Sequence, residues 1–171
     1  MGTDELAEIE RRLQAAGTLA ELQVVVRSAP RRLVGADGAT FVLRDIDMCF
    51  YVDEDAASPL WKGQRFPIER CISGWAMLNA ATAIVPDITV DDRIPLDAYL
   101  PTFVRSLVMV PVGIEKPVAA IGTYWARPYQ ATRAEVTRLE TLAARADEAI
   151  DRIGLDDAPF LKPSVRSSPA S

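Results

Sequence analysis

The chain contains no histidine among its 171 residues, and this absence removes several kinds of chemistry. Histidine is a frequent general base and a common metal ligand. A Ser-His-Asp or Cys-His catalytic arrangement, a His-ligated metal or haem, and a phosphoaccepting histidine are therefore all excluded. The two cysteines, Cys49 and Cys71, are too few for a four-cysteine zinc site. We expect no metal site and no catalytic residue, and we expect the protein not to be an enzyme.

Long apolar runs are also missing. The longest, residues 107–114, includes proline and glycine and is far shorter than the roughly 20 residues that a membrane-spanning helix needs. The first residues, MGTDELAEIERR, are acidic and lack the apolar stretch of a signal peptide. Without an export signal, the two cysteines are expected to be reduced thiols. These features predict a cytoplasmic protein with no membrane association.

Positive charge is scarce as well. Lys and Arg number 19 against 24 Asp and Glu, so that the net charge is −5. The densest basic spots are the pairs at residues 11–12 and 31–32, and acidic residues surround the first pair. Proteins that bind nucleic acid usually present a basic face or stripe. We therefore expect no nucleic-acid partner.

Hydrophobic residues make up 49% of the chain, which is enough for one domain with a sizeable core. Apolar residues at helical spacing predict three long helices. The first covers residues 3–16, and the second and third begin at capping boxes, Thr18 with Glu21 and Thr132 with Glu135. Pro30 leaves two interpretations of the second helix, which either kinks in its last turn or ends near residue 29.

Strand patterns fill most of the middle of the chain. Gly35 to Gly38 reads as a turn, residues 53–59 as a polar loop and residues 73–79 as a short helix. The last two long strands are apolar on both faces, which indicates cover on both sides of the sheet. Strands are predicted at residues 39–44, 48–52, 65–68, 82–85, 106–112 and 118–125. This order, with probable hairpins and few crossovers, predicts an α+β fold with a mainly antiparallel sheet.

A long connection over residues 86–101 shows no sustained period of its own. Loops of this length in a compact domain often bind something or cover a binding site. Aromatic side chains often line pockets, and a guanidinium can form two parallel hydrogen bonds with a carboxylate or phosphate. The candidate ligand-binding residues in and around the connection are Phe66, Cys71, Trp75, Asp87, Arg93, Tyr99, Phe103 and Arg105.

Each candidate also has a plainer interpretation. The rings are equally suited to ordinary core packing, and the arginines to ion pairs with Asp87, Asp91 or Asp92. Cys71 lies near a predicted helix start, where thiolate character rises, so it is either a reactive thiol or a small buried residue. Cys49 lies within a predicted strand, and reactivity is less expected there.

Four sequence segments, taken in their order along the chain, resemble the GAF domain family, the small-molecule sensory modules of signalling proteins. They are GADGATFVLRD, FPIERCISGWAMLNAATAIVPDITVDDR, FVRSLVMVPV and VAAIGTYWARPYQATRAEV. The resemblance covers roughly residues 18–153. The sequence around Cys71 is most similar to GAF modules of bacterial sensor kinases and related two-component proteins.

The resemblance implies a central antiparallel sheet with the long N- and C-terminal helices on one face. Short helices and loops would form a pocket on the other face, within residues 61–125. It also implies a homodimer and a ligand such as a cyclic nucleotide, bilin, haem or amino acid. The sequence departs from the bilin-binding pattern because Ile72 follows Cys71 where those modules have histidine. The phosphodiesterase cyclic-nucleotide signature is missing, and the ligand remains unidentified.

These observations favour a stand-alone sensory module that binds a small molecule and signals through a separate partner, such as a sensor kinase. The expected organisation is an N-terminal helix over residues 1–17, a GAF domain over 18–153 and a flexible tail over 154–171. The N-terminal helix has no obvious cover, so we expect it to be a dimer element. Two alternatives remain: a ligand-free dimerisation or scaffold module, and a redox sensor or thiol enzyme based on Cys71.

Overall fold

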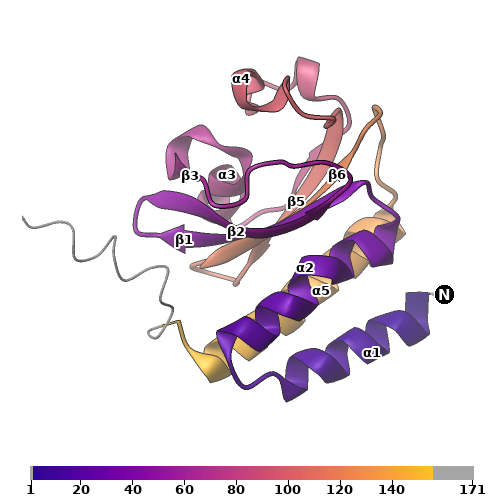
Figure 1. Ribbon diagram of the computed structural model, residues 1–171, viewed down its shortest axis with the longest axis vertical. Coiled ribbons are helices and arrows are strands. Elements are labelled where there is room, and N and C mark those ends of the chain that lie inside the picture. Colours follow the sequence, from indigo (N-terminus) through magenta and orange to yellow (C-terminus); the bar gives the residue numbers. More distant parts are fainter. Residues whose placement is uncertain (1, 156–171) are drawn as a thin grey trace, which may run out of the picture.

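A computed structural model describes residues 2–155 of the chain and shows three layers (Figure 1). A six-stranded antiparallel sheet forms the middle layer. Long helices cover one face, and short helices with irregular segments cover the other. The predicted α+β class is therefore confirmed. The expected tail lies outside the described residues, apart from Gly154 and Leu155.

The sheet has the strand order β3-β2-β1-β6-β5-β4, so the first long hairpin lies beside the last one. The two predicted strong strands are almost entirely buried, as expected for a sheet that is covered on both faces. The strands are β1 (Gly38–Asp45), β2 (Met48–Ala56), β3 (Arg65–Pro67), β4 (Ala83–Val85), β5 (Ser106–Val112) and β6 (Ala119–Trp125).

Five α-helices and two short 3-10 turns are found in the described part of the chain. The α-helices are α1 (Gly2–Ala15), α2 (Leu19–Val34), α3 (Ile72–Asn79), α4 (Leu96–Tyr99) and α5 (Arg133–Ile153). The 3-10 turn η1 (Ile68–Arg70) precedes α3, and the second, η2 (Ile88–Val90), lies within the long connection. The connection is therefore less irregular than expected, because it contains both η2 and α4.

The capping boxes begin α2 and α5 in different ways. At α5 the box is complete: the hydroxyl of Thr132 accepts the N–H of Glu135, and the Glu135 carboxylate accepts the N–H of Thr132. At α2 the Glu21 carboxylate accepts the N–H of Gly17 instead. The second helix continues through Pro30 to Val34, so it does not end near residue 29.

The N-terminal helix α1 packs on α2 and α5 of the same chain. Ile9 and Leu13 are each only 1% exposed. The side chain of Arg152, near the end of α5, donates to the backbone carbonyls of Leu13 and Ala16 at 3.1 and 2.7 Å. We expected the apolar face of α1 to have no packing partner within the chain. This is wrong, because α2 and α5 already bury that face.

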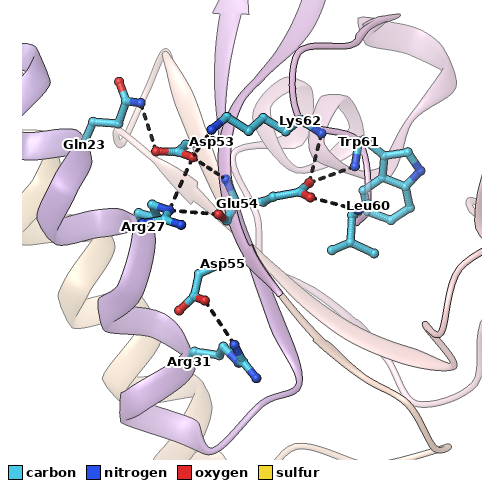
Figure 2. A network of polar contacts seen from close by, with 9 residues as sticks. All are labelled: Gln23, Arg27, Arg31, Asp53, Glu54, Asp55, Leu60, Trp61 and Lys62. Atoms are coloured by element: carbon cyan, nitrogen blue, oxygen red, sulfur yellow. Dashed lines mark hydrogen bonds and ion pairs between the residues drawn. The ribbon is translucent and has the colours of Figure 1, made fainter. Parts of the chain in front are cut away.

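The predicted loop over residues 53–59 is also wrong in its first half, because β2 continues to Ala56. Acidic residues are poor strand formers, but basic and amide side chains of α2 face these acids (Figure 2). Gln23 donates to the Asp53 carboxylate at 3.0 Å, and Arg31 pairs with Asp55 at 3.0 Å. A register shift between Phe41 and Val42 of β1 accommodates the longer partner strand.

No helix in the described range is both long enough and apolar enough to cross a membrane. The sheet face opposite the long helices packs against η1, α3 and the segment from η2 to Val104. That face carries most of the candidate residues.

Candidate functional site

Four aromatic side chains fill much of the space between this sheet face and the segments that cover it. The rings of this aromatic cluster belong to Tyr51, Trp61, Tyr99 and Tyr124, all less than 5% exposed. Trp61 is the central member, with ring centroids 5.7 Å from Tyr51, 4.7 Å from Tyr99 and 5.4 Å from Tyr124. The predicted pocket residue Tyr99 is therefore packed into the core.

Three of the four members of the aromatic cluster have hydrogen-bond partners for their polar ends within the protein. Trp61 donates its indole N–H to the Ala98 carbonyl at 3.0 Å, and the Tyr124 hydroxyl lies 2.7 Å from that of Thr40. Burial raises the pKa of Tyr51, Tyr99 and Tyr124 above the ordinary value of 10, so these phenols stay protonated at neutral pH. The cluster is therefore uncharged.

The carboxylate of Glu54 holds Trp61 in place. It accepts the backbone N–H groups of Leu60, Trp61 and Lys62, each at 2.9 Å (Figure 2). Three donors from consecutive residues on one carboxylate fix the turn that directs the indole into the core. Sequence analysis missed this role, since Glu54 looked like one of several acids in a polar loop.

Replacing Glu54 by alanine is expected to lower the free energy of unfolding by about 2–4 kcal/mol, because it leaves the N–H groups of the buried residues Leu60 and Trp61 without a hydrogen-bond acceptor. Asp55→Ala is the matched control. Asp55 makes a half-exposed pair with Arg31, so its loss should cost no more than about 1 kcal/mol. Urea unfolding of both variants checks this, and equal effects would contradict the assigned role of Glu54.

A pocket of about 250 Å³ lies at the start of α3. Three candidate residues, Cys71, Trp75 and Arg93, come together here. We call it the α3 pocket; its lining residues are Glu69, Arg70, Cys71, Trp75, Asp92, Arg93, Ile94 and Pro95. Sequence analysis did not single out Arg70 as a pocket residue, and its position next to Cys71 is the only signal that could have found it.

Arg93 is held at this pocket by two contacts. Its guanidinium carbon lies 4.5 Å from the centre of the Trp75 ring, and its Nε and Nη2 atoms donate to the Asp91 carboxylate at 2.9 and 2.7 Å. These bonds raise the pKa of Arg93 and lower that of Asp91. The plainer interpretation, a local ion pair, is thus correct for Arg93, and the pair fixes the guanidinium beside the indole.

The remaining candidates lie outside the α3 pocket lining. Asp87 caps η2 by accepting from the N–H and hydroxyl of Thr89. Arg105 donates to the backbone carbonyls of its neighbours at residues 102 and 104. The Phe66 ring meets Tyr51 edge to face at 5.5 Å. Phe103 lies over the start of β1, with its ring against Gly38.

Cys71 has polar neighbours although it lies in the core of this face. It is the residue that precedes α3, and the Ser73 hydroxyl lies 3.4 Å from its sulfur. The neighbouring Cys49 thiol is the largest influence that lowers the pKa of Cys71, to about 7, and the N–H groups of Ser73 and Gly74 act in the same direction. Cys49 correspondingly keeps its proton, because its pKa is raised.

Solved structures share this architecture. The chain superposes on the GAF domain of an Acinetobacter phosphoenolpyruvate-protein phosphotransferase with a TM-score of 0.76 and 15% identity, covering 88% of this chain and 93% of that one. A free methionine-R-sulfoxide reductase from Neisseria meningitidis, solved with its substrate, gives 0.74 and 18% identity over 86% of this chain and 87% of that one.

A third similar structure is the chromophore-binding domain of a bacteriophytochrome from R. palustris. The TM-score is 0.73 at 16% identity, and the match covers 88% of this chain but 61% of that domain. No protein-family model and no curated protein sequence matches the chain. At these identities the likeness establishes the fold, and the function has to be argued from the residues.

Proposed function

We propose that this chain, which has the fold of GAF domains, is a sensory or regulatory module that binds a small molecule in the α3 pocket. Occupancy of the pocket would alter the packing of α3 and the connection after it, and a partner such as a bacterial sensor kinase would read that change. We also propose a cytoplasmic setting and a homodimer. The observation that carries the proposal is the Arg93 guanidinium, stacked on Trp75 at a pocket that Cys71 also lines.

The size and charge of the α3 pocket narrow the ligand class. Its volume of about 250 Å³ lies slightly below the usual range for drug-sized ligands, about 300–1,000 Å³. Two basic residues, Arg70 and Arg93, and two acidic ones, Glu69 and Asp92, surround it. A small molecule with both an anionic and a cationic group fits this arrangement, and free amino acids are the simplest members of that class.

A thermal-shift screen of the wild-type protein against free amino acids, their decarboxylated amines and the matching carboxylic acids tests this proposal. We expect a rise in melting temperature with at least one amino acid, because a ligand that binds only the folded state stabilises it. Arg93→Ala should lose the rise, whereas Arg105→Ala, outside the pocket lining, should keep it. No shift with any compound, or a shift that survives Arg93→Ala, would count against it.

A ligand-free dimerisation or scaffold module is the second candidate. The aromatic cluster favours it, because Trp61 and its neighbours already fill space that larger ligands would need. Sedimentation of the unliganded protein over a range of concentrations, taken together with the ligand screen, separates the two. A stable dimer together with a negative ligand screen would favour the scaffold, and a monomer would exclude it.

A further inference from the structure

Two thiols, one lining the α3 pocket and one behind it, have no chemical role in the proposed function. Cys49 is the second residue of β2, opposite Phe66 of β3. The chain then continues through β3 and η1 to Cys71, which lies in the same buried cluster as Cys49, close enough that each thiol shifts the pKa of the other. Both are free thiols in the core, 0% and 6% exposed. Chain topology thus brings the two thiols together in the core of this face.

The two thiols differ in their surroundings. Cys71 lines the α3 pocket, which gives a small reagent a route to its sulfur, and Cys49 lies behind it. The Ser73 hydroxyl lies 3.4 Å from the Cys71 sulfur and 3.0 Å from the Tyr51 hydroxyl, so a polar chain continues inward from the thiol. With a pKa of about 7, Cys71 is partly thiolate at neutral pH, whereas Cys49 stays protonated.

We propose that Cys71 and Cys49 form a peroxide-responsive dithiol, in which Cys71 is the attacking residue and Cys49 the resolving residue. The Cys71 thiolate attacks one oxygen of a hydroperoxide, so that an S–O bond forms and the O–O bond breaks. The alkoxide or hydroxide that leaves takes up a proton. Cys71 is then a sulfenic acid: its sulfur has lost two electrons and the peroxide has gained them.

The second step closes the disulfide. The sulfur of Cys49 attacks the sulfur of Cys71, so that an S–S bond forms and the S–O bond breaks. The departing hydroxide combines with the proton of Cys49 as water. In sum, two thiols and one hydroperoxide give one disulfide, one alcohol or water, and one further water. The new bond ties the residue before α3 to β2, which would couple the oxidation state to the α3 pocket.

The first measurement uses the wild-type protein treated with hydrogen peroxide. Thiols are counted after unfolding, the intact mass is determined, and both are repeated after dithiothreitol. We expect the loss of both thiols together, a mass decrease equal to two hydrogens, and full reversal by the reductant. Peptide mapping of the same sample should find the segments around Cys49 and Cys71 cross-linked within one chain.

Two variants assign the roles. Cys49→Ser should stop at the sulfenic acid on Cys71, which dimedone traps, and Cys71→Ser should leave the Cys49 thiol intact. Two free thiols in peroxide-treated wild type, oxygen added to Cys71 without a cross-link, or a disulfide between two chains would each overturn the proposal. If a variant fails to fold, the peptide map of the wild type still shows whether Cys49 and Cys71 are cross-linked within one chain. Because no measurement uses the ligand screen, the outcome is independent of the proposed function.

Discussion

Trp61→Ala is expected to lower the free energy of unfolding by about 3–5 kcal/mol, the range for removing a large buried aromatic side chain. Trp61 is 4% exposed, contacts the other three rings of the aromatic cluster, and donates to the Ala98 carbonyl. Its loss leaves a cavity and an unsatisfied carbonyl. Urea unfolding followed by circular dichroism measures the effect without relying on tryptophan fluorescence.

Trp75→Ala is the matched control, because it removes the same side chain from the edge of this face. Trp75 is only partly buried and lies under the Arg93 guanidinium at the α3 pocket. We expect a cost of about 1–2 kcal/mol, typical of a partly exposed position. Equal costs for the two substitutions would show that the aromatic cluster does not support this face.

Addition of indole gives the Trp61→Ala experiment a second readout. An apolar cavity shaped by a missing side chain can bind a small ligand of the same shape. Indole should therefore restore part of the lost melting temperature in Trp61→Ala and leave the wild type nearly unchanged, in keeping with linkage between binding and folding. A variant that indole fails to rescue, with stability near that of the wild type, would mean that neighbouring side chains had closed over the space.

Much of the fold was predictable because the relevant signals are local. The apolar stripe of α5 and its capping box fall in one continuous segment, and the strands β5 and β6 are mostly apolar. The end of β2 was not predictable, because what stabilises Asp53 and Asp55 in a strand lies on α2. The single turn of α4 is too short for a periodic pattern to reveal it.

The candidate site was predictable in part and for a similar reason. Cys71 and Trp75 lie one helical turn apart, so their proximity follows from α3 alone. The stacking of Arg93 on Trp75 depends on how the later connection folds back. The contact between Cys49 and Cys71 depends on β-strand pairing and on η1, and residue spacing gives no sign of it. Spacing also cannot show that Trp61 takes up the space beneath the connection.

Gly74→Ala is expected to destabilise the protein by about 3 kcal/mol or more, at or beyond the upper end for overpacking a core. Gly74 lies in the first turn of α3, where η1 packs directly on it. A Cβ at this position would be 1.7 Å from the carbonyl oxygen of Ile68 and 2.5 Å from its carbon. These are backbone atoms, so relief requires a movement of η1 or α3 rather than a rotamer change.

That movement should also disturb the α3 pocket, because Cys71 and Trp75 lie on either side of Gly74. Gly17→Ala is the control, since its new Cβ would meet only the Glu21 carboxylate at an ordinary 3.6 Å. We expect the control to unfold like the wild type within about 0.5 kcal/mol. Gly74→Ala should unfold at lower urea, and its Cys71 should react faster with iodoacetamide as the helix start loosens. Equal stability and thiol reactivity in the two variants would mean that α3 can move away from Ile68 at little cost, and that the contact does not position the pocket.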